Sequence, residues 1–233
     1  GVGLGAHYLY NHIPSGADPL GPDNLLGFMS GLLTGTGSVM TGRWSVVTKS
    51  PLTGGWGDAN CGGTLSIQIK KCGYDGIIIG GKSSKPVYLQ INNNEVTLRD
   101  ASHLWGMDAI ESERVLLGES EVKRNTAVAV IGPAGEKLSL ISGISNDFGR
   151  YAARSGVGAV MGSKNLKGII LSGTGKVEGN HPELIRSISK EYIDKVRNAK
   201  LPGVVKGSML PIMGYMTGKQ NDYGPIDGMI TAS

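Results

Sequence analysis

The stretch LLGFMSG, residues 25–31, decides the fold, because the pattern that begins with it occurs twice in the chain. It is typical of a buried strand that ends at a glycine. It is followed first by Gly42-Arg43 and then by a second apolar run, Gly76-Ile77-Ile78-Ile79. The order is therefore an apolar strand, a glycine–arginine pair, and a strand that opens on glycine.

The same order returns in the second part of the chain. Apolar residues 127–131 run into Gly132 and are followed by Gly149-Arg150 and by Gly168-Ile169-Ile170-Leu171. The spacing between the arginine and the last run is shorter here, and a glycine-rich chain can produce such an order by chance. We interpret it as an internal duplication, with one arginine on a glycine-lined loop in each half.

Composition narrows the class of protein. Of 233 residues, 38 are glycine, and these lie between apolar runs, which indicates a folded chain with many tight turns. The net charge of +4 comes from dispersed lysines and arginines, and aromatic residues are scarce, so a nucleic-acid surface is not expected. No apolar run is long enough for a membrane span. The two cysteines, Cys61 and Cys72, exclude a disulfide framework or a zinc site and suit the cytoplasm.

The periodicity predicts an α+β protein. The predicted helices are 4–13, 108–117 with Asp108 as its cap, and 180–200. Residues 64–73 fit either a strand or a helix, and 156–163 form a small-residue segment. The predicted strands are 25–30, 43–48, 75–81, 86–91, 95–99, 126–132, 138–141 and 168–172.

The stretch TGRWSVVTKSPLTGGWGDANCGG, residues 41–63, predicts a ligand site. Glycines let backbone N–H groups approach a ligand, and arginine binds phosphate through a planar fork of donors. Arg43 and Arg150 together therefore indicate a large anion held from two sides, although each alone is also compatible with a surface charge. Asn60 is compatible with a turn position or with an oxygen ligand for Mg²⁺.

The other motifs in the sequence give little indication of function. The opening GVGLGA has no strand before it and no acidic ribose-binding residue after it, so it is not a dinucleotide fingerprint. The four histidines are scattered, and no nucleophile elbow is present. Asp58 and Asp147 lie near the candidate loops without further support as acids. No catalytic residue is predicted.

Several strings resemble one known family. GRWSVVTKSPLTG (42–54), GYDGIIIGGK (73–82) and GVGAVMGSKNLK (156–167) are similar to the N-terminal domain of the tungsten-containing aldehyde:ferredoxin oxidoreductases. The resemblance covers residues 1 to about 175 and continues thinly to the C-terminal end. It implies a pterin-cofactor-binding domain at 1–175, with a helix and the start of a following domain at 176–233.

The resemblance also implies a fold and a site. The fold is a base of two β-sheets related by a pseudo-twofold, which carries a tungsten bis-pyranopterin cofactor. Two sets of residues match positions that contact the cofactor, and Asn60 and the carbonyl of Tyr151 match the contacts to a Mg²⁺ shared by the pterin phosphates. The first set is Arg43, Asn60 and Gly62, and the second is Arg150, Tyr151 and Ala153.

The chain departs from the family pattern at three positions. Tyr151 stands where a small residue is usual, and Ala153 and Ser155 replace glycines. A backbone contact tolerates these changes better than close packing does, so the expected clearance is less secure on the second side.

The implied activity is oxidation of aldehydes to carboxylates, with ferredoxin or another iron–sulfur carrier as partner. The 4Fe-4S cluster of the family needs cysteines that lie outside this chain, so the fragment alone is expected to be inactive. Two alternatives stay open: a fragment of the related tungsten benzoyl-CoA reductase, or a non-catalytic truncated scaffold. The substrate, the choice of tungsten or molybdenum, and a homo-oligomeric state are not decided by the sequence.

Overall fold

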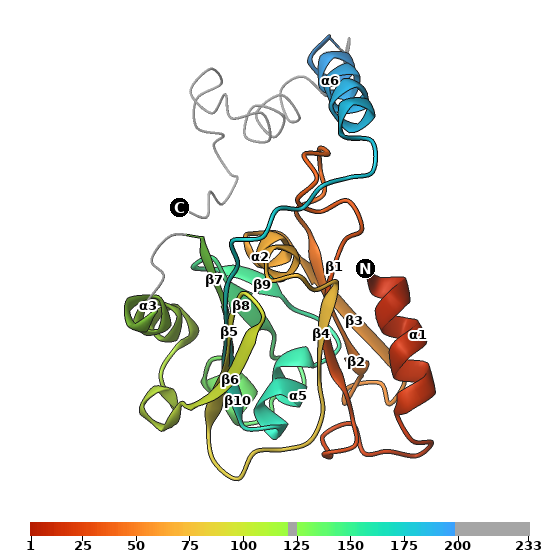
Figure 1. Cartoon of the computed structure of the whole chain (residues 1–233). Coiled ribbons are helices and arrows are strands. Elements are labelled where there is room, and N and C mark those ends of the chain that lie inside the picture. Colours follow the sequence, from red (N-terminus) through yellow and green to blue (C-terminus); the bar gives the residue numbers. More distant parts are fainter. Residues whose placement is uncertain (121–124, 199–233) are drawn as a thin grey trace, which may run out of the picture. The chain divides into compact units, whose positions relative to one another are not determined.

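The structure is a computed structural model that describes residues 1–120 and 125–198. Residues 1–185 form one compact unit, and a second unit begins at residue 186. The first unit is built from two β-sheets with helices on their flanks, so the predicted α+β class is confirmed (Figure 1). The part of the predicted domain 176–233 that follows residue 198 lies outside the described residues.

The first sheet has four antiparallel strands in the order β3-β2-β1-β4. Helix α1 packs against β1 and β2. The bounds are α1 Val2–His12, β1 Leu26–Ser30, β2 Trp44–Lys49, β3 Trp56–Cys61 and β4 Gly76–Ile79.

The second sheet has six strands in the order β6-β5-β10-β7-β8-β9. Only the β5–β10 pair is parallel, and every other neighbour is antiparallel. The bounds are β5 Val87–Asn92, β6 Glu95–Asp100, β7 Thr126–Val130, β8 Ile144–Asn146, β9 Arg150–Ala152 and β10 Leu166–Ser172.

The remaining helices lie between strands, except for the last one, which follows β10. Asp108 caps α3 as predicted, because its Oδ1 accepts the backbone N–H of Glu111 at 3.0 Å. The ambiguous segment 64–73 is the helix α2. The bounds are α2 Leu65–Lys71, the 3₁₀ turn η1 Ser102–Leu104, α3 Ala109–Glu119, α4 Pro133–Glu136, α5 Val157–Ser163 and α6 Pro182–Asn198.

The two halves repeat one another strand by strand. Strands β1, β2, β3 and β4 are matched in order and direction by β7, β8, β9 and β10, and a helix precedes the last strand in each half. In each half, four residues lie side by side as paired neighbours across the four strands and form a row. The first row is Gly76, Met29, Ser45 and Asn60, and the second is Gly168, Val130, Ser145 and Tyr151. The predicted duplication is therefore present down to the pairing register.

One part of that prediction is wrong. Arg43 precedes β2, whereas Arg150 is the first residue of β9, and β9 corresponds to β3. The two arginines therefore do not occupy equivalent loops. The equivalent residues are Asn60 and Tyr151, which pair with Ser45 and Ser145 respectively.

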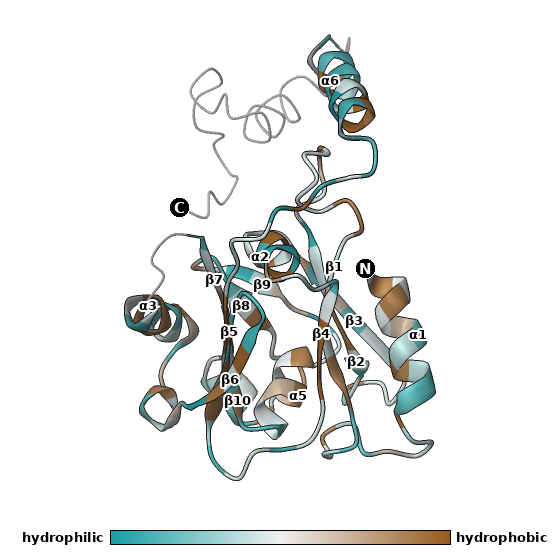
Figure 2. Cartoon of the chain, in the orientation of Figure 1, coloured by the Kyte–Doolittle hydropathy of each residue, from teal (hydrophilic) through white to brown (hydrophobic). Residues whose placement is uncertain are grey.

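Among the described residues, the largest of three buried apolar clusters joins the halves. It contains Leu26, Phe28 and Trp44 from the first half together with Ile144 and Val160 from the second, all of them buried. Figure 2 shows the hydrophobic residues on the strands and on α5 that contribute to it. Burial of this apolar surface is the main term that stabilises the two sheets against each other.

The predicted strand at 138–141 is wrong. This segment is a turn in which Leu138 has φ +58° and Ile141 is 82% exposed, and the strand begins later, at Ile144. An extended strand excludes a positive φ, so the local backbone cannot continue in the sheet. Strands β3 and β9 were not predicted, since their buried positions are occupied by small residues rather than by an apolar run.

Candidate functional site

The edges of the two sheets meet where β3 lies beside β9. We call β3, β9 and the turns that follow them the seam. Two side-chain bonds close it: Ser50 Oγ donates to the carbonyl of Ser155 at 2.9 Å, and Ser155 Oγ donates to the carbonyl of Asp58 at 3.2 Å. The seam therefore joins the halves along the edge strands that carry the predicted site residues.

Arg43 and Asn60 lie in direct contact at the seam. Arg43 Nε donates to Asn60 Oδ1 at 3.0 Å, its second nitrogen Nη2 also reaches Oδ1, and the carbonyl of Asn60 lies 3.4 Å from Nη2. Both residues are exposed. The Asn60 side chain thus orients the guanidinium group of Arg43.

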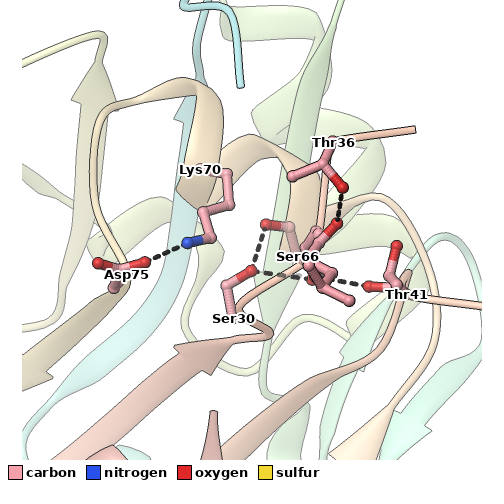
Figure 3. Close-up of polar contacts among 8 residues, drawn as sticks. Ser30, Thr36, Thr41, Ser66, Lys70 and Asp75 are labelled. Carbon is pink, nitrogen blue, oxygen red and sulfur yellow. Dashed lines mark hydrogen bonds and ion pairs between the residues drawn. The ribbon is translucent and has the colours of Figure 1, made fainter. Parts of the chain in front are cut away.

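A buried hydroxyl network fixes the loop that delivers Arg43. Ser30 Oγ donates to the carbonyl of Ser66 at 3.0 Å, and Ser66 Oγ donates to the carbonyl of Arg43 at 3.1 Å. Within the loop, Thr34 Oγ1 donates to the carbonyl of Thr41 at 2.5 Å. Figure 3 shows Ser30, Ser66 and Thr41 converging at this junction. The backbone of Arg43 is therefore held on β1 and α2 before its side chain begins.

Gly62 is the point on which both arginines converge. A Cβ at this position would lie 3.3 Å from Arg150 Nη1 and 4.0 Å from Arg43 Nη1. The carbonyl of Gly62 accepts Trp44 Nε1 at 3.3 Å and Asn146 Nδ2 at 3.2 Å. A fixed, bare backbone with two guanidinium groups close to it fits an anionic ligand such as a phosphate.

The turn between β8 and β9 reaches across the seam through Asp147. Its carboxylate accepts the backbone N–H of Thr64 at 2.8 Å and the Thr64 hydroxyl at 2.6 Å. The Nε atom of Arg150 lies 4.0 Å from the same carboxylate. Asp147 therefore ties the start of α2 to the turn that carries Arg150, which is a structural task rather than that of an acid.

Glu113 supports this turn from α3. Its side chain is buried and accepts the backbone N–H of Phe148 at 2.9 Å. Burial raises the pKa of the Glu113 carboxyl, and the nearby charge of Asp147 adds to that effect. The turn needs such support because Asp147 and Phe148 have φ values of +46° and +54°. No pattern in the sequence pointed to Glu113, since it reads as an ordinary helix residue.

Burial also raises the pKa of the Cys61 thiol, while the positive charges of Arg43 and Arg150 oppose the shift. Cys61 Sγ lies 3.1 Å from Asn146 Oδ1. Both Cys61 and Cys72 are free and buried. Among residues 1–120 and 125–198, no group of three His, Cys, Asp or Glu side chains gathers as a metal site.

The second predicted set lies at the seam as well. Arg150, Tyr151 and Ala153 are exposed, and Tyr151 is 50% exposed. Ser155, which replaces a glycine of the family pattern, has φ +57°, a conformation that favours glycine. Its hydroxyl bond to Asp58 offsets part of this cost.

The structure thus brings Arg43, Asn60, Gly62 and Arg150 together.

In the described part of the chain, no helix is long and apolar enough to cross a bilayer.

Comparison with known proteins gives a consistent result. The model of the aldehyde ferredoxin oxidoreductase N-terminal domain matches residues 1–173. The tungsten-containing aldehyde ferredoxin oxidoreductase of Pyrococcus furiosus is 43% identical over 204 residues, which cover 86% of this chain and 33% of that protein. The enzyme of the same description from Thermococcus kodakarensis is 44% identical over 202 residues, with the same coverage.

Two further relatives have other descriptions. A Pyrococcus furiosus aliphatic sulfonate oxidoreductase, WOR-like subunit, is 39% identical over 207 residues, covering 82% of this chain and 33% of the relative. Among solved structures, the BamBC active-site complex of benzoyl coenzyme A reductase with 1,5-dienoyl-CoA matches with a TM-score of 0.82 and 39% identity, over 84% of this chain and 30% of that one. The chain spans about a third of the length of these relatives.

Proposed function

The chain belongs to the aldehyde ferredoxin oxidoreductase family through its N-terminal domain, and we propose that residues 1–175 bind a tungsten bis-pterin cofactor along the seam. The observation that carries this proposal is the convergence of Arg43 and Arg150 on the bare backbone of Gly62. Each pterin carries a phosphate, and a guanidinium group binds phosphate with two parallel hydrogen bonds. In this proposal Arg43 binds the phosphate of the first pterin, and Arg150 binds the phosphate of the second.

The backbone carbonyls of Asn60 and Tyr151 are the proposed contacts to Mg²⁺ between the phosphates. They are supported by the pairing register, because these two residues take the same place in the two halves. The Asn60 side-chain oxygen accepts two donors of Arg43, whereas the Asn60 carbonyl accepts one long bond of 3.4 Å, so the carbonyl is the better candidate for the metal. Mg²⁺ binds oxygen ligands of this kind and retains water in its other positions. Gly62 and Ala153 provide the backbone against which the pterins lie.

For the whole protein we propose oxidation of an aldehyde to a carboxylate. When bound, the tungsten–pterin group would supply oxygen transfer and take up the two electrons that the aldehyde loses as it gains the oxygen of water, with release of two protons. Ferredoxin or a similar iron–sulfur carrier then takes up these electrons. A 4Fe-4S cluster and the acid–base residues come from parts of the protein outside this chain, and the free, buried cysteines fit a cytoplasmic location.

The match to the benzoyl coenzyme A reductase complex keeps reduction of an aromatic thioester as a second candidate. The aldehyde reaction is favoured because the family model and the relatives above 40% identity carry that description. Assay of the holoenzyme with aldehydes and with benzoyl-CoA distinguishes the two.

The proposed site is tested by cofactor content. We expect Arg43→Ala and Arg150→Ala each to weaken cofactor retention by about ten- to a hundredfold, because a charged hydrogen bond contributes about 1.5–3 kcal/mol. Arg→Lys variants recover only part of the loss, since lysine keeps the charge but lacks the fork. Tungsten per folded chain is measured, with Arg114→Ala on the exposed face of α3 as control.

Asn60→Ala separates two roles of that residue. If its side chain orients Arg43, the variant loses cofactor as Arg43→Ala does and added Mg²⁺ restores nothing. If the side-chain oxygen itself binds the metal, added Mg²⁺ recovers part of the loss by mass action. Full tungsten occupancy in the Arg43→Ala/Arg150→Ala double variant would contradict the phosphate assignment.

A further inference from the structure

Strand β6 is an end strand of the six-stranded sheet, and it carries two apolar side chains that protrude into solvent. Val96 is 54% exposed and Leu98 is 66% exposed. Their partners on β5, Ile91 and Leu89, are buried in the core. Paired residues share a face, so the apolar layer of the core continues outward to the edge of the sheet.

The hairpin geometry decides which backbone groups of β6 point away from β5. Strands β5 and β6 are joined by a two-residue turn, with Asn92 paired to Glu95. Pairs in an antiparallel ladder alternate between bonded and non-bonded, and the pair that closes a two-residue turn is bonded. Glu95, Thr97 and Arg99 therefore bond to β5, whereas the N–H and C=O groups of Val96 and Leu98 point away from it.

We propose that β6 pairs antiparallel with β6 of a second copy of this chain, with the two Thr97 residues facing each other on a twofold axis. In this register Val96 faces Leu98 of the copy, and both have outward backbone groups that form a bonded pair. Glu95 faces Arg99 of the copy, which places opposite charges together twice. The two sheets then continue as one, with their apolar faces on the same side.

The other registers that match outward groups are worse. An axis at Leu98 places Val96 opposite Asp100, and an axis at Val96 places Glu95 opposite Thr97. Only the axis at Thr97 satisfies both the apolar and the charged positions. A contact of six residues per strand is smaller than a standard interface of about 1,200 Å² or more, so the dimer is expected to dissociate on dilution.

Charge reversal tests the register in the full chain. Glu95→Arg creates two like-charge pairs across the axis and is expected to weaken dimerisation about tenfold, as measured by sedimentation velocity over a concentration series. The Glu95→Arg/Arg99→Glu double variant exchanges the signs and restores the dimer. A structural effect of the first change alone would not be repaired by the second, so absence of restoration overturns the register.

A cysteine pair gives an independent test. Facing residues in a non-bonded antiparallel pair have Cα atoms about 4.5 Å apart, within the range of a disulfide. Thr97→Cys is therefore expected to crosslink two chains under mild oxidation. Glu95→Cys, exposed on the same face of the same strand, faces position 99 of the copy and does not crosslink. A monomeric chain, or equal crosslinking of the two variants, overturns the proposal.

Discussion

Lys164 is buried in the fold, and burial disfavours the charged form of its amino group. Its side chain is 3% exposed, and Nζ donates to the carbonyls of Asn24 at 2.5 Å and Gly81 at 3.2 Å. Burial lowers its pKa to about 8, against a smaller opposing effect of Asp23. The lysine therefore binds the two segments that flank β1 and β4 to the start of β10.

This burial predicts a pH-dependent stability. Between about pH 8 and 10.5 the unfolded chain binds the Lys164 proton and the folded chain does not, so the free energy of unfolding rises with pH across this window. The gain is roughly 2–3 kcal/mol. Lys164→Met lacks it, so its destabilisation relative to wild type is larger at pH 10 than at pH 7. Urea unfolding at both values, with the exposed Lys137→Met as control, measures the difference. An equal difference at both pH values would argue against a buried, neutralised lysine.

The site residues could be named from sequence strings, but their contacts could not. Arg43, Asn60 and Gly62 come from one stretch, whereas Asp147 and Arg150 come from another, far away in sequence. Their meeting depends on the β3–β9 seam, which no local pattern encodes. The pairing of Asn60 with Arg43 and the support from Glu113 follow only once that seam is in place.

Helix α5 shows how small residues build an element into a tight space. A Cβ at Gly158 would lie 2.5 Å from the carbonyl oxygen of Gly143, so only glycine fits there. The whole of α5 is buried, and it packs against α4. The small residues of the segment 156–163 therefore allow α5 to pack closely against the neighbouring backbone.

Two glycine-to-alanine changes are expected to act in opposite directions. Gly158→Ala forces a methyl group against backbone and destabilises the fold by about 1–3 kcal/mol or more. Gly118→Ala, in α3 with nothing within 4 Å of the added Cβ, stabilises it by about 0.5–1 kcal/mol. Thermal and urea unfolding of both variants decide this. A neutral Gly158→Ala would show that α5 has room to move.

Elements with continuous apolar runs, such as β7 and β10, could be predicted because burial on both faces selects such runs. Strand β3 could not, although its burial alternates regularly along Trp56–Cys61. Its inward positions are Gly57, Ala59 and Cys61, which carry too little apolar surface to produce a recognisable pattern. The helix α2 was ambiguous because seven residues are too few to separate the two periods.

At the scale of the whole molecule, the shared core makes the two halves one folding unit. Ile144 of β8 lies in the same buried cluster as Phe28 of β1, with neither side chain exposed. Losing contacts in one half therefore weakens the other.

Ile144→Ala is expected to lower the free energy of unfolding by about 2–5 kcal/mol. Because the core is continuous, the slowest-exchanging amides of both β1 and β7 should lose the same protection in native-state hydrogen exchange. Loss confined to β7 and its neighbours would mean that the halves unfold separately. A matched exposed change, Ile141→Ala in the preceding turn, should affect neither strand.

The paired rows that end at Asn60 and Tyr151 restrict how this chain tolerates insertions and deletions. One residue added within β2 or β8 would turn every later side chain in that strand to the opposite face and shift the edge residue away from its place in the row. The connections carry no such constraint, and the two halves already differ there: three residues join β8 to β9, and six join β2 to β3. Length variation among relatives of this domain should therefore concentrate in the turns, while the strands keep their length.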